Sequence, residues 1–297
     1  MAISPAEKRI RAGLALTRTL TAYVPVSIAQ WGIRKSAERV SLGDNIQREA
    51  VNADGVRCEW LTPNDSLGDR VLLYIHGGGF IYGLTSMHLE MAAYLAKKIG
   101  IRVLMVDYRL APEHPFPAAL DDCVTAYRWL LQQGFAGDHI AIAGDSAGGN
   151  LTITTMLQLR DNDIPLPGAA ACLSPVTDLS NKQGLFQQQY DAVLHPRATR
   201  FMNASYLAGQ DARNPLISPV FSDLQGLPPM LIHVGEEEVL CDDAVRIATL
   251  AEEVGVSVQL EIYPRMWHVW QLFLSLPQAV QSLDAIAHFI DEHLDIT

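Results

Sequence analysis

One serine near the middle of the chain stands in a pattern that suits a nucleophile. The run Gly144-Asp145-Ser146-Ala147-Gly148 comes directly after the apolar run Ile140-Ala141-Ile142-Ala143, and residues 151–160 that follow are long enough for a helix. A Gly-x-Ser-x-Gly motif between a strand and a helix is typical of a nucleophile elbow, a strained turn that projects the serine hydroxyl from the carboxyl edge of a sheet. A Cβ at either glycine would clash with the neighbouring strand or helix. The motif is short, and an ordinary strand–turn–helix junction is the alternative.

A serine hydroxyl is a weak nucleophile, so this hypothesis requires a base that takes its proton. The chain has nine histidines, and His268 lies in the loop between the last predicted strand, residues 256–263, and the closing helix, residues 277–293. Loops that follow parallel strands meet at the sheet edge where the serine stands. We therefore expect His268 to be the base, although a single histidine is more often a core or surface residue.

The base in turn needs a carboxylate that orients it. The loop after the predicted strand 230–234 carries five acidic side chains, which are Glu236, Glu237, Glu238, Asp242 and Asp243. We expect Glu238 to be the acid, because it has room to turn inward before the apolar Val239 and Leu240 anchor the loop. Asp242 is the second candidate. A solvated acidic turn that caps the next helix is the alternative.

Backbone donors for a developing oxyanion are expected from a second glycine-rich loop. His76-Gly77-Gly78-Gly79 follows the apolar run 71–75, which reads as a central strand. Three glycines let backbone N–H groups approach a substrate oxygen closely, and the N–H of Ala147 begins the helix after the serine. A flexible turn or a phosphate loop is the alternative, but Phe80-Ile81-Tyr82 lacks the Gly-Lys-Ser/Thr ending of a phosphate loop.

Strand-like and helix-like segments alternate over most of the chain. This order predicts an α/β fold, with a mostly parallel sheet covered by helices on both faces, and the turn at Asp54-Gly55 between two early strands makes the sheet mixed. Residues 1–42 read as two helices divided at Pro25, which would form a lid over a site or an ordinary flanking pair. Residues from 178 to about 214 lack a strand pattern and read as an excursion of helices and loops.

Composition limits the classes of partner. The chain has 297 residues, is 49% hydrophobic and carries a net charge of −11, which argues against nucleic acid and anionic membranes. We find no apolar run long enough to span a bilayer and no signal peptide, so we expect a cytoplasmic protein. The four cysteines are far apart, which favours free buried thiols over disulfides or a metal site.

Three motifs together resemble the bacterial hormone-sensitive-lipase-like esterases, the family IV carboxylesterases of the α/β-hydrolase superfamily. They are His76-Gly77-Gly78-Gly79-Phe80, the segment 107–118 (DYRLAPEHPFPA), and Gly144-Asp145-Ser146-Ala147-Gly148-Gly149-Asn150. The resemblance implies an α/β-hydrolase fold with a helical cap. Residues 1–42 would form part of this cap, residues 43–297 the catalytic domain, and residues 179–214, approximately, a cap insertion. It also implies hydrolysis of short-chain carboxylic esters of small molecules, with no cofactor and no metal.

The resemblance assigns roles to individual positions. Ser146 would be the nucleophile and His268 the base, while Gly78, Gly79 and Ala147 would bind the oxyanion in a loop that Gly77 completes. The family usually has Asp-Pro-Leu-x-Asp at the acid, whereas this chain has Glu238-Val239-Leu240-Cys241-Asp242, with a glutamate in place of the first aspartate. The segment 107–118 would support the site structurally, through a buried pair of Asp107 and Arg109 that locks a proline-stiffened loop.

Several alternatives stay open at this point. An amidase, a deacetylase or a lactonase would use the same triad, and the gibberellin receptor resembles this family without hydrolysing anything, although it lacks the base. An exposed sheet edge would allow a homodimer. Large side chains of the two helical segments would either narrow the pocket and select short acyl chains, or form the core of the cap; they are Tyr23, Trp31, Phe201, Met202, Tyr206 and Leu207.

Overall fold

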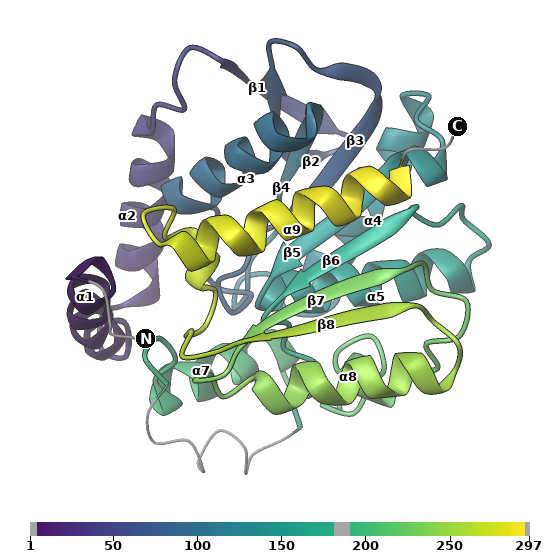
Figure 1. The fold of residues 1–297 in the computed structure, drawn as a ribbon. Coiled ribbons are helices and arrows are strands. Elements are labelled where there is room, and N and C mark those ends of the chain that lie inside the picture. Colours follow the sequence, from purple (N-terminus) through teal and green to yellow (C-terminus); the bar gives the residue numbers. More distant parts are fainter. Residues whose placement is uncertain (1–4, 181–190, 295–297) are drawn as a thin grey trace.

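A twisted sheet runs through the middle of the molecule (Figure 1). In residues 5–180 and 191–294, which the computed structural model describes, this sheet has eight strands in the order β1-β2-β4-β3-β5-β6-β7-β8. The strands are β1 (Ile46–Ala53), β2 (Val56–Pro63), β3 (Leu67–Ile75), β4 (Ile101–Asp107), β5 (Ile140–Asp145), β6 (Ala169–Leu173), β7 (Met230–Gly235) and β8 (Val258–Tyr263). Pairs β1–β2 and β2–β4 are antiparallel and the others are parallel, so the predicted mixed α/β-hydrolase sheet is confirmed.

Helices cover both faces of the sheet. On one face α3 (Ser86–Ile99) packs beside α9 (Pro277–Leu294), and their apolar residues join one core layer. On the other face lie α4 (Ala118–Gln132), α5 (Ala147–Asp161) and α8 (Cys241–Glu253), which join a second layer. The central strands β3 and β5 are buried from both sides, because the residues of 71–75 and 140–143 face the two layers alternately. Short 3-10 helices cover Gly137–His139, Pro219–Phe221 and Trp270–Leu272.

The turn between β5 and α5 is as tight as the glycine pattern predicts. Ser146 has φ 54° and ψ −115°, a sparsely populated conformation for a residue with a side chain. A Cβ on Gly144 would collide with the carbonyl oxygen of Gly148, and a Cβ on Gly148 would collide with that of Ile75 on β3. The two glycines therefore let α5 leave β5 directly against the neighbouring strand, which leaves Ser146 at the apex of the turn.

Helices outside the two sheet layers lie beside the carboxyl ends of the strands. They are α1 (Pro5–Thr21), α2 (Val26–Arg39), which begins after Pro25 as predicted, and α7 (Pro196–Leu207). In Figure 1, α1 and α7 lie near the ends of β7 and β8. The division into a cap and a catalytic domain stays a prediction, and part of the cap insertion, residues 181–190, lies outside the described residues.

The pairing expected within the segment 107–118 is wrong. Arg109 does not pair with Asp107 but binds Asp122 of α4, with its Nη2 2.7 Å from Asp122 Oδ1 and its Nε 3.0 Å from the same carboxylate. Asp107 instead pairs with Arg57 of β2, at 2.7 Å. Asp107 is the last residue of β4, and Arg57 lies directly opposite it on β2. The side chain of Arg57 is therefore closer to Asp107 than that of Arg109, which is two residues further along the chain.

All four cysteines are free thiols; Cys58, Cys123 and Cys172 are buried, and Cys241 is half-buried. No helix of the described residues is long and apolar enough to cross a membrane. Over the same ranges, no group of three or more His, Cys, Asp or Glu side chains is arranged to hold a metal ion.

Candidate active site

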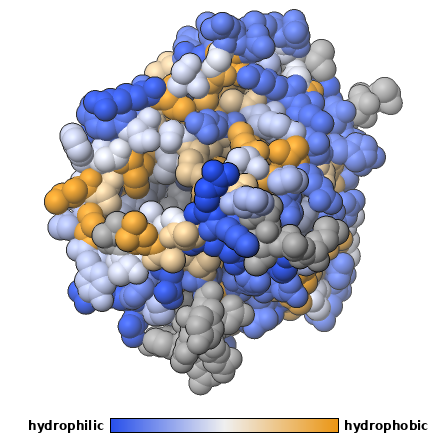
Figure 2. All heavy atoms as spheres, turned by 60° about the vertical axis from the view of Figure 1, so that its left-hand side comes forward, coloured by the Kyte–Doolittle hydropathy of each residue, from blue (hydrophilic) through white to orange (hydrophobic). Residues whose placement is uncertain are grey.

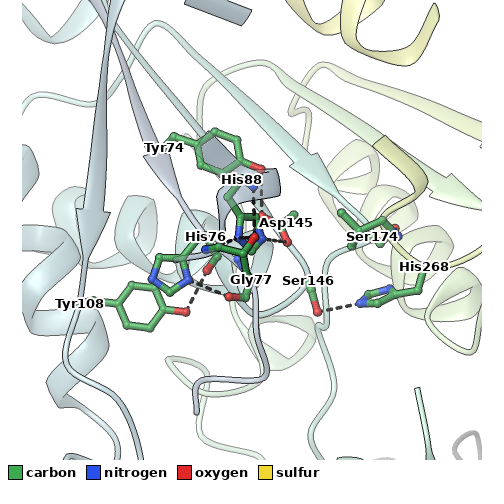
Figure 3. Close-up of polar contacts among 11 residues, drawn as sticks. Tyr74, His76, Gly77, His88, Tyr108, Asp145, Ser146, Ser174 and His268 are labelled. Carbon is green, nitrogen blue, oxygen red and sulfur yellow. Dashed lines mark hydrogen bonds and ion pairs between the residues drawn. The ribbon is translucent and has the colours of Figure 1, made fainter. Parts of the chain in front are cut away.

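Three side chains from separate loops form one hydrogen-bonded chain at the carboxyl edge of the sheet. Figure 3 shows the contact between Ser146 and His268. The Oγ of Ser146 lies 2.9 Å from Nε2 of His268, and Nδ1 of His268 lies 2.7 Å from Oε2 of Glu238. Ser146 stands after β5, Glu238 after β7, and His268 after β8. A serine hydroxyl that donates to Nε2 and an Nδ1–H that donates to a carboxylate are the arrangement of an activated nucleophile.

Glu238 is held in place on its second oxygen as well. Its Oε1 accepts the backbone N–H of Gly235 and the hydroxyl of Ser174, which lies 2.8 Å away. The side chain is completely buried, whereas Asp242 is exposed in the first turn of α8. Of the two acids that the sequence offered, the structure therefore brings Glu238 and not Asp242 to His268.

The surroundings of His268 favour its protonated form. The ring is only 5% exposed, and this burial is the largest single effect and acts to lower its pKa, whereas the hydrogen bond and the charge of Glu238 act to raise it. The negative charges of Asp191 and Asp145 act in the same direction, so the pKa of His268 is raised above its ordinary value. A ring with this environment can hold a proton taken from Ser146 until a leaving group needs it.

Ser174 is a residue of the site that sequence reasoning missed. It follows β6, the strand between β5 and β7, after which Ser146 and Glu238 stand. Its φ is 47°, and its side chain contacts the loop after β7 that carries Glu238, which we call the acid loop. Its Oγ donates to Glu238 and accepts the N–H of Val269 at 3.3 Å. Ser174 thus joins the acid loop to the loop after β8 that carries His268, which we call the histidine loop. The signal that could have found it is its place: a polar residue at the carboxyl end of a strand next to the elbow strand.

The glycine loop after β3 lies beside Ser146, with Gly78 and Gly79 lining the same cavity. Both have positive φ, 122° and 60°, which glycine adopts without strain. Ala147 is the first residue of α5, where backbone N–H groups have no partner within the helix. Gly77 differs from its neighbours, because its N–H donates to Oδ1 of Asp145 at 3.0 Å and is thus already engaged.

Asp145 ties this glycine loop to the elbow. Its Oδ1 also accepts the hydroxyl of Tyr74 at 2.9 Å, and its Oδ2 lies 3.3 Å from Nε2 of His88 (Figure 3). His88 Nδ1 accepts the N–H of Thr85, which leaves Nε2 to donate to the carboxylate. Burial acts to raise the pKa of Asp145, but His88, Tyr74 and Gly77 lower it below its ordinary value, so the carboxylate stays ionised.

His76, the first residue of the glycine loop, is a neutral packing residue. Its ring stacks on Tyr108 with centroids 4.3 Å apart, and its Nδ1 lies 2.7 Å from the carbonyl oxygen of Gly77. Complete burial is the main cause that lowers the pKa of His76, to about 4. The ring therefore stabilises the loop from behind and takes no part in the hydrogen-bonded chain of Ser146.

A cavity of about 290 Å³ opens in front of Ser146. The glycine loop after β3, the loop that carries His268 and the helices α1 and α7 all contribute to its wall, and most of the lining is apolar. Residues outside the two sheet layers that line it include Leu14, Val193, Leu194, His195, Ala198 and Met202. The volume is at the small end of the range of about 300–1,000 Å³ that is typical of ligand pockets.

The large side chains proposed to narrow the pocket have different fates. Met202 lines the cavity and packs so closely on Gly79 that a Cβ there would collide with its sulfur. Tyr206 is fully buried and stacks on Phe80, with ring centroids 3.7 Å apart, so it belongs to the core. Leu207 packs against the core as well.

The other aromatic candidates face solvent. Phe201, Tyr23 and Trp31 are 48%, 66% and 59% exposed, and none of them lines the cavity. Figure 2, which brings the side with α1 and α2 forward, shows hydrophobic side chains scattered among hydrophilic ones on this face. Met202 is therefore the one member of that set that reaches the cavity in the described residues.

Comparison with known proteins agrees with this geometry. Residues 72–272 match the family model described as the alpha/beta hydrolase fold. An acetyl-hydrolase of Streptomyces hygroscopicus is 40% identical over 245 residues, which cover 82% of each protein, and an esterase of Acinetobacter venetianus is 36% identical over 248 residues, again 82% of each.

Solved structures give the same result over nearly the whole chain. A crystal structure of an esterase from the bacterial hormone-sensitive lipase family superposes with a TM-score of 0.92 at 38% identity, covering 99% of this chain and all of that one. A mutant of the esterase E40 superposes with a TM-score of 0.93, also at 38% identity and with coverage of 99% and 100%. The chain therefore belongs to the alpha/beta hydrolase fold family and, within it, to the bacterial hormone-sensitive-lipase esterases, and it is a carboxylic ester hydrolase.

Proposed function

We propose that this esterase works through an acyl-enzyme intermediate on Ser146, with His268 as the base and Glu238 as the acid that orients it. The observation that carries the proposal is the unbroken chain of contacts, 2.9 Å from Ser146 to His268 and 2.7 Å from His268 to Glu238. All three groups are at the wall of a cavity or directly behind it, where a substrate carbonyl can approach Ser146.

The first half of the cycle acylates the serine. His268 Nε2 takes the proton of Ser146 as the oxygen attacks the ester carbonyl, and the tetrahedral oxyanion accepts the N–H groups of Gly78, Gly79 and Ala147. The protonated ring, held by Glu238, then gives its proton to the leaving alcohol as the C–O bond breaks. Gly77 stays outside this donor set, because its N–H is bound to Asp145.

The second half of the cycle releases the carboxylic acid product. His268 takes a proton from water as the water oxygen attacks the acyl carbon, and the same backbone N–H groups bind the second oxyanion. The ring returns its proton to Ser146 Oγ as the acyl group leaves. Glu238 stays ionised throughout and keeps the Nδ1–H tautomer of the ring, which is the tautomer that leaves Nε2 free to accept.

We propose short-chain carboxylic esters as substrates. The cavity volume of about 290 Å³ and the contact of Met202 with the glycine loop leave little room for a long acyl chain beside Ser146. Names of relatives support this class, since one is an acetyl-hydrolase and another is an ethyl acetate hydrolase of Pseudomonas putida.

The proposal is tested by labelling and by substitution of the serine. An organophosphate should label one residue of the native protein, and peptide mass analysis should identify it as Ser146. Ser146→Ala should abolish both labelling and hydrolysis of p-nitrophenyl butyrate while thermal unfolding is unchanged. Near-normal turnover by this variant would overturn the mechanism, and rates on a matched ester and amide measure whether the enzyme also hydrolyses amides.

A further inference from the structure

One arginine of α1 contacts both of the loops that carry the acid and the base. Nη1 of Arg11 lies 2.8 Å from Oε2 of Glu237, and Nη2 donates to the backbone carbonyl of Arg265. The guanidinium also lies over the ring of Trp267, 4.9 Å from its centroid. Glu237 immediately precedes Glu238 and Trp267 immediately precedes His268, so one planar group contacts a chain neighbour of each.

This guanidinium is fixed from its own helix. Glu7, one turn earlier on α1, is 2% exposed and its Oε1 lies 3.2 Å from Nε of Arg11. Ile10 and Leu14 of the same helix pack on the apolar cluster that contains Trp267. Arginine has five donors in a rigid plane, so it can serve Glu7, Glu237 and the carbonyl of Arg265 at once, which a lysine cannot do with the same geometry.

A second contact reaches the acid loop from the segment before α7. Asp191 is 2% exposed; its Oδ2 accepts the N–H of Val239 at 3.0 Å. Its Oδ1 accepts the N–H groups of Val193 and Leu194, both at 2.7 Å, and these two residues line the cavity. Glu238 thus lies between Glu237, which contacts α1, and Val239, which contacts the segment before α7.

We propose that Arg11 and Asp191 are positioning residues, which align Glu238 and His268 and so make the acid–base pair depend on the docking of α1 and of the segment before α7. The inference rests on the proposed roles of Glu238 and His268. The acid and histidine loops already share direct contacts, among them those from the N–H of Glu237 to the carbonyl of Met266 at 3.0 Å and from the N–H of Arg265 to Oε2 of Glu236 at 2.9 Å, and Arg11 adds a further bridge on the outer side. A displacement of about 1 Å in such a pair is enough to slow a reaction substantially.

Anchoring alone would be a purely structural role, and it predicts different kinetics. If Arg11 only fastened α1, its loss would lower the melting temperature or raise KM, because α1 lines the cavity through Leu14. If Arg11 aligns the pair, its loss should lower kcat at saturating substrate. It should also move the acid limb of the kcat/KM profile to lower pH, because a looser contact with Glu238 supports the imidazolium less.

The experiment compares Arg11→Met with Arg11→Lys and with Arg9→Met, an exposed arginine of the same helix, as the matched control. With p-nitrophenyl butyrate we expect about a tenfold lower kcat for Arg11→Met and a KM within about twofold of the native value. Arg11→Lys should recover only part of kcat, and Arg9→Met should behave as the native enzyme. An unchanged kcat in Arg11→Met, or a change confined to KM or melting temperature, would overturn the proposal.

A second variant tests the other side of Glu238. The charged groups that act on His268 are Glu238, Asp191 and Asp145, and Asp191→Ala removes one of these negative charges together with the contact to Val239. We expect a lower kcat and an acid limb of kcat/KM shifted to lower pH. If circular dichroism shows that Asp191→Ala is folded, and its kcat and the acid limb of its kcat/KM profile equal those of the native enzyme, Asp191 does not position Glu238.

Organophosphate labelling separates failure of this inference from failure of the mechanism. If the native enzyme is never labelled on Ser146, the proposed mechanism is wrong, and this inference is wrong with it. If the native enzyme is labelled and Arg11→Met is labelled at the same rate, only the positioning role is wrong. Labelling that reaches completion in Arg11→Met but is slowed in parallel with kcat is the expected result.

Discussion

Asp145 accepts the backbone N–H of Gly77 on its Oδ1 at 3.0 Å, so the residue before the proposed nucleophile holds the loop proposed to bind the oxyanion. The approach is so close that a Cβ on Gly77 would collide with the Asp145 carboxylate. The same oxygen accepts the Tyr74 hydroxyl. This buried carboxylate therefore contributes to the spacing between Ser146 and the N–H groups of Gly78 and Gly79.

Replacing this carboxylate by an amide should slow turnover. Asp145→Asn can keep an oxygen toward Gly77 and Tyr74, but its NH₂ then faces Nε2–H of His88, from which Oδ2 accepts a hydrogen bond in the native protein. The resulting shift of the glycine loop should lower kcat by about 10- to 100-fold, which is somewhat less than the loss expected when one oxyanion donor is removed completely. The measurement is kcat with p-nitrophenyl butyrate. Asp161→Asn, an exposed carboxylate at the end of α5, is the control, and equal rates in both variants would contradict the prediction.

The identity of the acid is tested by two isosteric amides. Glu238→Gln should lower kcat by about 10³- to 10⁴-fold, since an NH₂ facing Nδ1 of His268 forces the proton onto Nε2, which can then no longer accept from Ser146. Asp242→Asn should leave kcat within about twofold, because the side chain is exposed. Steady-state kinetics of the two variants at pH 8 decide the question. The opposite order of the two effects would transfer the role to Asp242.

The pH profile should report the raised pKa of His268. The ring must be neutral to take the proton of Ser146, so kcat/KM falls as the pH drops through its pKa. Burial lowers that pKa, but Glu238, Asp191 and Asp145 raise it above the ordinary 6.5, and the acid limb should therefore have its midpoint above pH 6.5. Initial rates between pH 5 and 9, with stability checked at each pH, measure it. A midpoint clearly below 6.5 would show that Glu238 does not outweigh burial.

Acyl preference should respond to Met202 and not to its neighbour. Met202→Ala removes the side chain that packs on Gly79, so the cavity gains room beside Ser146. The preferred p-nitrophenyl ester should then move to a longer acyl chain. We expect about a tenfold gain in relative kcat/KM for octanoate over butyrate, since the space gained buries roughly two more methylenes at about 0.8 kcal/mol each. Phe201→Ala alters an exposed side chain of the same helix and should keep the native profile. An unchanged profile in Met202→Ala would place the limit on acyl length elsewhere.

Sequence patterns gave the elements around Ser146 nearly to the residue. The apolar run 140–143, which lies in β5, and the break at Pro25 before α2 are local features, set by hydrophobic side chains and by proline. The order of strands and helices then placed the loops after β5, β7 and β8 at one edge, because parallel strands end on the same side of a sheet. The serine, the histidine and a carboxylate could thus be assigned to one place before any coordinates were known.

Tertiary structure decided which side chains meet there. Five carboxylates lie in the loop after β7 and the first turn of α8, and only the structure separates Glu238, which turns inward to Ser174 and His268, from the exposed Asp242. Arg109 binds Asp122 and not Asp107, a choice that depends on how α4 packs on β4. The contacts of Arg11 with Glu237 and Arg265 join positions more than 220 residues apart. Residue types and local spacing fix where a strand or helix begins and ends, but side-chain direction and loop docking depend on the packing of distant segments, which no local pattern contains.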